Sequence, residues 1–182
     1  LDGTHLVTAS NDTSVIVWSL PDGEILHTLD AHTERVHSVA VSPDGLQILS
    51  GSGDQRMILW DIESGDIIRT YTAHTGGVRD VAFSPDGALL ISASEDDTLL
   101  LWDKASLEPA QSFIGHGEDV NTVVFSADGQ QLVSGGEQGF VIYWRIDTLE
   151  ALLDWTRSHR YIVELSCDTR RQYSLQITDE CG

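Results

Sequence analysis

The chain has 182 residues, of which 41% are hydrophobic and 21% charged, as in an ordinary globular protein. Acidic residues outnumber basic ones by 29 to 10, and the formal net charge of −19 argues against a nucleic-acid partner, which would need a basic surface. The sequence contains no run of 18 or more apolar residues, so we expect no membrane-spanning helix.

A pattern of 42 residues recurs along the first 146 residues. Its most regular members are tryptophan at positions 18, 60, 102 and 144 and histidine at positions 32, 74 and 116. A turn follows each histidine, with the sequence Ser-Pro-Asp-Gly at 42–45 and 84–87 and Ser-Ala-Asp-Gly at 126–129. Proline presets φ and the final glycine accepts a positive φ, so this turn predicts a hairpin, and the replacement of proline by Ala127 should loosen the turn without changing it. A fixed period of this length indicates a repeat array.

These motifs resemble those of the WD40-repeat family, which has a period of about 40–45 residues and Gly-His and Trp-Asp signatures. The signatures survive as Gly115-His116, Trp60-Asp61 and Trp102-Asp103, and are altered to Ala31-His32, Ala73-His74, Trp18-Ser19 and Trp144-Arg145. The resemblance covers residues 1–146 and implies an all-β fold of about four propeller blades, with repeats near 1–30, 31–72, 73–114 and 115–146. It also implies a non-catalytic scaffold for protein–protein interaction, here the C-terminal part of a bacterial repeat protein.

Within each repeat, the strand before the tryptophan is apolar throughout, which is typical of a strand that is covered on both faces. The family usually has Lys or Arg in this strand, so we expect unusually apolar contacts between blades at Ile16, Ile58, Leu100 and Ile142. Outer strands are expected at 25–29, 67–71 and 110–114. Position 1 then falls after the first strand of the first blade, so upstream blades or self-association would close the ring.

Residues 147–182 depart from the repeat. Asp147 and Glu150 have the spacing of a capping box, and leucines at helical spacing follow, which together predict a helix over 148–159. The segment 161–173 is either a second short helix or a decayed fifth repeat. We expect this helical tail to cover the outer edge of the fourth blade; contact with another chain, or an incoming N-terminal strand at that edge, are the alternatives.

Both cysteines, Cys167 and Cys181, lie in this tail, and the repeats contain none. No disulfide framework is implied, which fits a reducing compartment, and we expect a cytoplasmic protein. Free thiols are the expected state, with a bridge as the alternative if the two Cα atoms lie within about 7 Å of each other.

Ser, His and Asp recur at fixed spacings, and this pattern has two interpretations. His74, Ser92 and Asp96 are the residue types of a hydrolase triad. However, the same spacings recur one period earlier, whereas a nucleophile is needed only once per site. In WD40 proteins these residue types form a buried hydrogen-bond chain with the tryptophan, once in each blade. The resemblance implies such chains for Thr8, Asp12 and Trp18; for His32, Ser50, Asp54 and Trp60; for His74, Ser92, Asp96 and Trp102; and for His116, Ser134 and Trp144, with Gln138 in place of the last aspartate.

Sites for metals and cofactors are not indicated. The acidic clusters at 95–97 and 118–119 lack the ligand spacing of a calcium loop. No phosphate-binding loop and no Cys-x-x-Cys pair occurs. We therefore expect no metal and no cofactor.

The resemblance places partner binding at the narrow end of the propeller, on residues that flank the first-strand valine or precede the turn aspartate. We expect a protein or peptide partner there, recognised by a surface of mixed charge. The alternative is a sensor or regulatory domain of a larger bacterial signalling or defence enzyme, such as a kinase, protease or NTPase. The candidate residues are Asn11, Arg35, His37, Gly53, Gly77, Arg79, Glu95, Asp119, Asn121 and Glu137.

Overall fold

The computed structural model describes residues 3–146, which form fourteen β-strands and no helix. The predicted helical tail and both cysteines lie outside the described residues. The strands pair into four antiparallel sheets of three or four strands, each resembling a propeller blade. The predicted all-β fold is therefore confirmed for this part of the chain. Since the described range has no helix, it contains none that would be long and apolar enough to cross a membrane.

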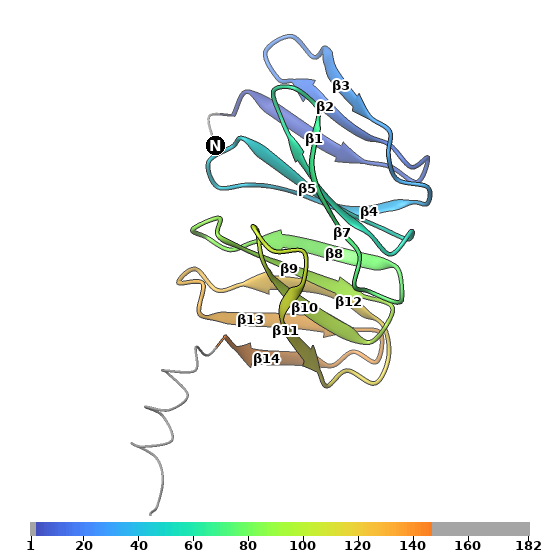
Figure 1. The fold of residues 1–182 in the computed structure, drawn as a ribbon, viewed down its shortest axis with the longest axis vertical. Coiled ribbons are helices and arrows are strands. Elements are labelled where there is room, and N and C mark those ends of the chain that lie inside the picture. Colours follow the sequence, from blue (N-terminus) through green and yellow to red (C-terminus); the bar gives the residue numbers. More distant parts are fainter. Residues whose placement is uncertain (1–2, 147–182) are drawn as a thin grey trace, which may run out of the picture. The chain divides into compact units, whose positions relative to one another are not determined.

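In every sheet, strands that follow one another in the chain are paired (Figure 1). The first sheet contains β1 (His5–Ala9), β2 (Val15–Ser19) and β3 (Ile25–Leu29). The second contains β4 (Val36–Val41), β5 (Gln47–Ser52), β6 (Met57–Asp61) and β7 (Ile67–Tyr71). The third contains β8 (Val78–Phe83), β9 (Leu89–Ser94), β10 (Thr98–Asp103) and β11 (Pro109–Ile114). The fourth contains β12 (Val120–Phe125), β13 (Gln131–Gly136) and β14 (Val141–Arg145).

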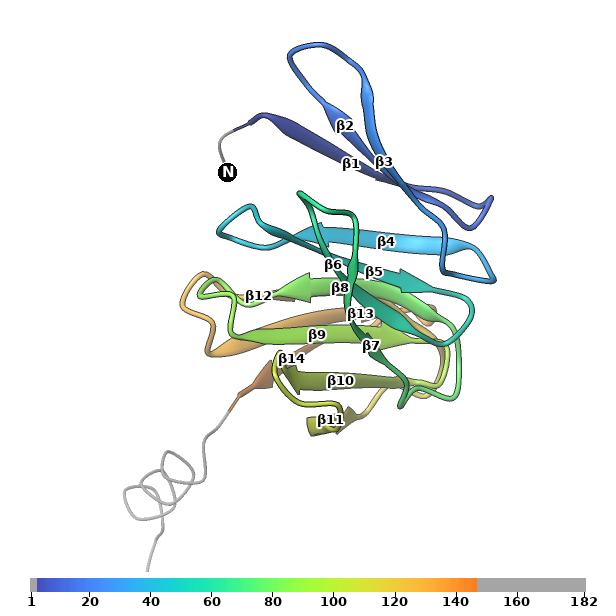
Figure 2. The same cartoon turned by 45° about the horizontal axis from the view of Figure 1, so that its top comes forward.

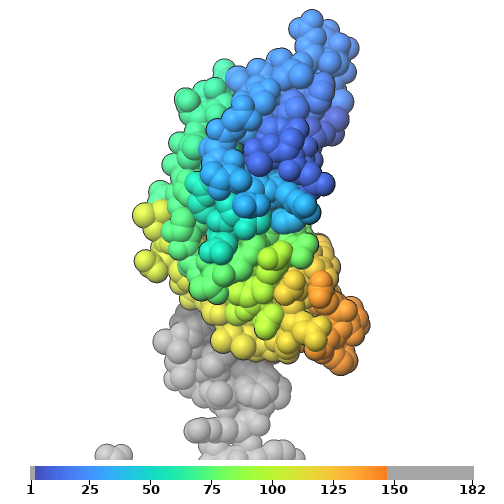
Figure 3. Space-filling model, turned by 90° about the vertical axis from the view of Figure 1, so that its right-hand side faces the viewer, coloured from blue at the N-terminus to red at the C-terminus, as the bar shows by residue number. Residues whose placement is uncertain are grey.

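The four sheets stack in chain order. β4 contacts β8, β8 contacts β12, and β1 contacts β4, so the first strands of the last three sheets are neighbours (Figures 1 and 2). Figure 3 shows the same succession of sheets as a change of colour from blue to orange. The loops that precede β4, β8 and β12 therefore lie beside one another along one side of the stack.

The repeated turn has one geometry in its three copies. In each copy the serine Oγ lies 2.5–2.6 Å from the aspartate Oδ1. The closing glycines, Gly45, Gly87 and Gly129, have φ values of 77°, 71° and 71°, which is the left-handed region that favours glycine. The copy with Ala127 keeps this geometry, as predicted, because the serine–aspartate bond and the glycine define the turn without proline.

Apolar side chains fill the space between successive sheets. We call the side of a sheet that meets the next sheet its forward face, and the opposite side its rear face. On the forward face of the second sheet, Leu49, Met57, Leu59 and Tyr71 pack against the rear face of the third, formed by Val78, Val81, Leu90, Leu100 and Trp102. Equivalent clusters join the first sheet to the second and the third to the fourth.

The apolar replacements in the strand before the tryptophan take part in these contacts. Ile58 and Leu100 lie buried on the rear faces of the second and third sheets. Ile16 and Ile142, at the equivalent positions of the two end sheets, are half-buried. The predicted apolar contacts between blades are thus present in the two middle sheets.

Candidate interaction surface

A chain of hydrogen bonds runs through the third sheet. The Trp102 Nε1–H group donates to Ser92 Oγ over 3.1 Å, and Ser92 Oγ lies 2.7 Å from His74 Nε2. On the other side of the ring, His74 Nδ1 lies 2.8 Å from Asp96 Oδ2. When Nδ1 carries the imidazole proton, the serine hydroxyl donates to Nε2 and each polar atom has a partner.

The second sheet contains the same chain of hydrogen bonds. Trp60 Nε1–H donates to Ser50 Oγ over 2.9 Å, and His32 bridges Ser50 Oγ and Asp54 Oδ2 over 2.7 and 2.9 Å. Arg56 adds an ion pair, with its Nη2 atom 2.7 Å from Asp54 Oδ2. The second and third sheets thus hold their carboxylates in the same place with different additional partners, since Thr98 Oγ1–H donates to Asp96 Oδ1 over 2.6 Å.

The charge states in the second sheet follow from these contacts. Burial raises the pKa of Asp54, but hydrogen bonds from Arg56, the Thr33 backbone and His32 outweigh it and lower the pKa to about 2. Burial lowers the pKa of His32, and this outweighs the opposite effect of Asp54. Asp54 is therefore ionised and His32 neutral at pH 7.

The first and fourth sheets contain only part of this hydrogen-bond chain. In the first sheet Trp18 Nε1–H donates to Thr8 Oγ1 over 3.0 Å, while Asp12 accepts from the Ser14 hydroxyl over 2.7 Å. In the fourth sheet Ser134 Oγ lies 2.7 Å from His116 Nε2 and accepts from Trp144 Nε1–H over 2.8 Å. Within the described residues, no hydrogen bond joins Gln138 to that histidine.

Accessibility weighs against the alternative of a hydrolase triad. Ser50 and Ser92 are fully buried, and each hydroxyl is already bonded to a histidine and a tryptophan. A substrate carbonyl has no approach to either oxygen in the folded sheet. The geometry favours a structural network over a nucleophile.

The aspartate that ends the hydrogen-bond chain of the third sheet, Asp96, fixes the nearby loops. Asp96 Oδ2 accepts from the Thr75 backbone N–H over 2.9 Å, and Glu95 N–H donates to the Gly77 carbonyl over 2.9 Å. The segment before β8 and the turn after β9 are therefore held side by side. This places the Glu95 side chain beside the first residues of β8.

Three of the predicted partner-binding residues form a charged group, which we call the Arg79 cluster: Arg79, Glu95 and Asp119. Arg79 Nη2 lies 3.6 Å from Asp119 Oδ2, and Arg79 Nε lies 2.9 Å from Glu95 Oε1. The latter contact is an ion pair without hydrogen-bond alignment, because the buried Nε–H points off the line to the carboxylate. Each of the three side chains is about one-third exposed, so solvent and a partner reach the cluster.

The second sheet extends this surface. Burial lowers the pKa of His37, and the positive charge of Arg79 lowers it further, so this histidine lies within the electrostatic reach of the cluster. A Cβ atom at Gly77 would lie 3.0 Å from Glu95 Oε2 and 3.1 Å from the Cα of Gly53. Glycine at position 77 therefore permits the loop before β8 to approach the turn after β5 closely. The carbonyl of exposed Arg35 accepts from Gly53 N–H over 2.9 Å.

The remaining predicted residues are less connected. Glu137 is exposed and joins the surface through its backbone N–H, which donates to the Asp119 carbonyl over 3.0 Å. Asn11 and Asn121 are exposed, and no hydrogen bond of their side chains is found within residues 3–146. The structure therefore links the candidates of the second, third and fourth sheets and leaves Asn11 and Asn121 apart.

Asp80 is a residue that the sequence reasoning missed. Its Oδ1 atom accepts from the Ser38 hydroxyl over 2.8 Å, and its Oδ2 atom accepts from the Thr122 hydroxyl and the Val123 N–H, both over 2.9 Å. One carboxylate on β8 therefore links β4 and β12. The available signal was positional, because Ser38, Asp80 and Thr122 occupy the same place in three successive repeats.

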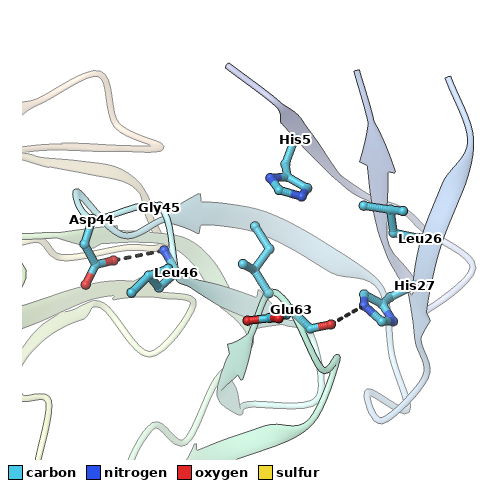
Figure 4. A pocket seen from close by; sticks show the side chains of 8 residues that line it. His5, Leu26, His27, Asp44, Gly45, Leu46 and Glu63 are labelled. Atoms are coloured by element: carbon cyan, nitrogen blue, oxygen red, sulfur yellow. Dashed lines mark hydrogen bonds between the residues drawn. The ribbon is translucent and has the colours of Figure 1, made fainter. Parts of the chain in front are cut away.

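A cavity of about 540 Å³ lies between the first and second sheets, near the β4–β5 and β6–β7 turns and so at the opposite end of the sheets from the Arg79 cluster. Figure 4 shows that His27, His5 and Leu26 come from the first sheet and Glu63 from the second, with the His27 ring bonded to the Glu63 carbonyl over 2.9 Å. Although histidines and carboxylates line it, the described residues place no group of three or more potential ligands where it would hold a metal ion. The cavity contains none of the predicted partner-binding residues.

Comparison with known families gives an independent measure of the repeat. A family model described as WD domain, G-beta repeat, matches residues 23–61, 65–103 and 107–145, which together exceed half of the chain. Each match begins before an outer strand and continues through the first three strands of the next sheet, as in β3–β6. A search of curated proteins finds no significant match to the chain.

Proposed function

Because this chain belongs to the WD40-repeat family, we propose that it is a non-catalytic interaction module whose protein or peptide partner binds at the Arg79 cluster. WD40 repeats generally mediate protein–protein interactions. The observation that carries the proposal is the ion-paired group of Arg79, Glu95 and Asp119, which lies where the loops of three sheets converge.

The support beneath this surface favours recognition of a defined partner shape. Asp96 binds the loop that precedes Arg79, and Asp80 joins the first strands of three sheets just below it. Loops held by buried bonds lose little conformational entropy when a partner binds, which favours affinity.

The charges of the surface favour a polar partner of mixed charge. Arg79 contacts two carboxylates that remain about one-third exposed, and Arg35 and Glu137 are exposed beside them. A partner carboxylate can displace one acidic residue from Arg79, while a partner Lys or Arg binds the acidic residue that is released. Such contacts give specificity and fast association that weaken as salt is added.

Selection from a displayed library of random peptides, with the whole 182-residue chain immobilised, tests this proposal. We expect the selected peptides to lose at least tenfold in affinity for Arg79→Glu. The matched control is Arg69→Glu, the same charge reversal on the outer strand β7. Equal melting temperatures of the two variants would exclude unfolding as the cause.

Two results would contradict the proposal. One is a set of selected peptides that bind Arg79→Glu as tightly as the wild type. The other is a set whose affinity depends on Glu63, which lies at the opposite end of the sheets. Either result would move the binding site away from the Arg79 cluster.

A further inference from the structure

The turn between β13 and β14 differs from the equivalent turns of the other three sheets. Three alternate positions of this turn are Ser-Asp-Ser at 10, 12 and 14, Ser-Asp-Arg at 52, 54 and 56, and Ser-Asp-Thr at 94, 96 and 98. In the fourth sheet the same positions are Gly136, Gln138 and Phe140. The central carboxylate and both polar residues beside it are therefore replaced together, in a turn that the structure describes completely.

The aspartate of this turn accepts from a fixed pair of N–H groups in the second and third sheets. Asp54 Oδ2 lies 2.9 Å from His32 Nδ1 and accepts from the Thr33 N–H over 3.0 Å. The third sheet has the same two contacts, over 2.8 and 2.9 Å. In the fourth sheet the equivalent groups are His116 Nδ1 and the Gly117 N–H, and neither has an acceptor within residues 3–146.

The hydrogen bonds on the other side of the His116 ring make Nδ1 a donor. Ser134 Oγ accepts from Trp144 Nε1–H over 2.8 Å and lies 2.7 Å from His116 Nε2. The serines of the second and third sheets have a further acceptor, a strand carbonyl 3.3 Å away, whereas Ser134 has none among the described residues. The Ser134 hydroxyl therefore donates to Nε2, and the ring proton lies on Nδ1. His116 is only 8% exposed, so little of its ring reaches water.

The space beside this N–H group admits part of a ligand. It measures about 10 Å³ and is lined by His116, Gly117 and Gln138 among others. This is close to the minimum volume that admits one water-sized group. The Gln138 side chain is exposed and forms no hydrogen bond to His116, so it can turn into solvent while a ligand atom enters.

Acidic neighbours do not prevent a carboxylate from binding such a pair of donors. Glu118 and Glu137 are exposed beside the space. In the third sheet Glu95 stands at the position of Glu137, directly before Asp96. Burial raises the pKa of Asp96, but hydrogen bonds, the largest from His74, outweigh it and lower the pKa below its usual range. The charged carboxylate is thus stable there beside a second acid.

We propose that His116 Nδ1–H and the Gly117 N–H bind a carboxylate, which supplies the acceptor that the turn aspartate provides in the second and third sheets. One carboxylate oxygen accepts from both N–H groups, and the rest of the ligand extends into solvent. The carboxylate belongs either to a free anion or to an acidic side chain of a peptide. Asp119, a member of the Arg79 cluster, follows in the same loop, but the site does not involve Arg79 and exists whether or not a partner binds there.

Nuclear magnetic resonance spectra of the whole 182-residue chain, recorded during addition of sodium formate, test the proposal. We expect the His116 ring and Gly117 N–H signals to shift until the site is saturated. The His74 signals should stay unchanged, because Asp96 fills the equivalent site. Sodium chloride at the same ionic strength should have no effect. Gln138→Asp should abolish the shift, since its own carboxylate occupies the site, and Gln138→Asn should retain it.

The source of the carboxylate is distinguished with acetyl-Gly-Asp-Gly-amide, for which acetyl-Gly-Asn-Gly-amide is the uncharged control. Tighter binding of the aspartyl peptide than of formate assigns the site to an acidic side chain, and equal or weaker binding assigns it to a free carboxylate. Removal of two charges, in Glu118→Gln with Glu137→Gln, should tighten formate binding about threefold.

Four results would overturn the proposal. Formate could cause no saturable shift, or could act no differently from chloride. The Gln138→Asp variant could still respond to formate. The His74 signals could shift together with those of His116. Any of these would mean that the donors of the fourth sheet do not select a carboxylate.

Discussion

The third and fourth sheets share one part of a hydrogen-bond chain and differ in the other. In both, the tryptophan N–H donates to a serine that lies 2.7 Å from a histidine. In the third sheet the histidine continues to Asp96. In the fourth, Gln138 stands at that position, and a cavity of about 10 Å³ lies beside His116.

This difference separates two tasks within the repeat. The Trp–Ser–His part keeps its geometry in the fourth sheet without the aspartate, so this geometry does not depend on the carboxylate. The aspartate instead fixes loops, since Asp96 accepts from the Thr75 backbone and the Thr98 hydroxyl. We infer that loss of the first part destabilises a sheet, whereas loss of the second part mainly loosens the surface above it.

The largest contrast is expected from removal of the tryptophan. Trp102 is fully buried, and Trp102→Ala should lower the free energy of unfolding by about 3–5 kcal/mol. Trp144 is only half-buried, so Trp144→Ala should cost less. Urea denaturation followed by circular dichroism measures both variants. Equal losses would show that the burial of the ring does not determine its contribution.

Removal of the aspartate should have the next largest effect. Asp96→Ala leaves the His74 Nδ1 group and the Thr75 N–H without their acceptor, and should cost about 2–3 kcal/mol. Gln138→Ala, at the equivalent position of the fourth sheet, should change stability by less than about 0.5 kcal/mol. The same denaturation measurement applies. A large loss from Gln138→Ala would mean that the amide replaces the carboxylate after all.

Acid should distinguish the sheets that contain the carboxylate from the one that does not. The pKa of Asp54 is lowered from 3.8 to about 2, so this carboxylate stabilises the folded state above pH 4. Its contribution, about 2 kcal/mol, should disappear as the pH falls from 4 to 2, because the unfolded state takes up the proton first. Unfolding free energies across this range should decline less steeply for Asp54→Asn than for the wild type. Gln138→Ala should follow the wild-type curve, and a flattened curve for that variant would contradict this assignment.

Placing an aspartate at position 138 of the fourth sheet should give the smallest change in stability. With Gln138→Asp, a carboxylate is placed to accept from His116 Nδ1 and from the Gly117 N–H, as Asp96 does one period earlier. Nearby Glu118 and Glu137 repel the new charge, so we expect a gain of only about 0.5–1 kcal/mol. The melting temperature gives the effect, with Gln138→Asn as the uncharged control. A variant that melts below the wild type would show that repulsion outweighs the new bonds.

The sequence was informative wherever one repeat determines its own structure. The turn at 42–45, the strand that contains Trp60 and the spacing of His32 from Ser50 all depend on contacts within one period of the chain. Because these contacts recur 42 residues apart, the four sheets and the positions of the hydrogen-bond chains were predictable before the structure.

Contacts between repeats were less predictable. A polar residue at alternate positions of a strand is normally assigned to solvent, and Asp80 fits that pattern. Its partners Ser38 and Thr122 lie 42 residues away on either side and become neighbours only when the sheets stack. The resemblance located Arg79 and Glu95, but their pairing depends on loop conformations that spacing alone does not specify.

The bonds of Asp80 to two neighbouring sheets affect how the array of sheets unfolds. In an array whose units contact only their neighbours, unfolding spreads from an end one unit at a time. The Asp80 carboxylate couples β4 to β12, which belong to sheets that are not adjacent in the chain. Loss of the second or the fourth sheet removes a bond from the third, so we expect these three sheets to unfold more cooperatively than apolar packing alone would make them. Asp80 does not reach the first sheet, so we expect that sheet to fray before the other three.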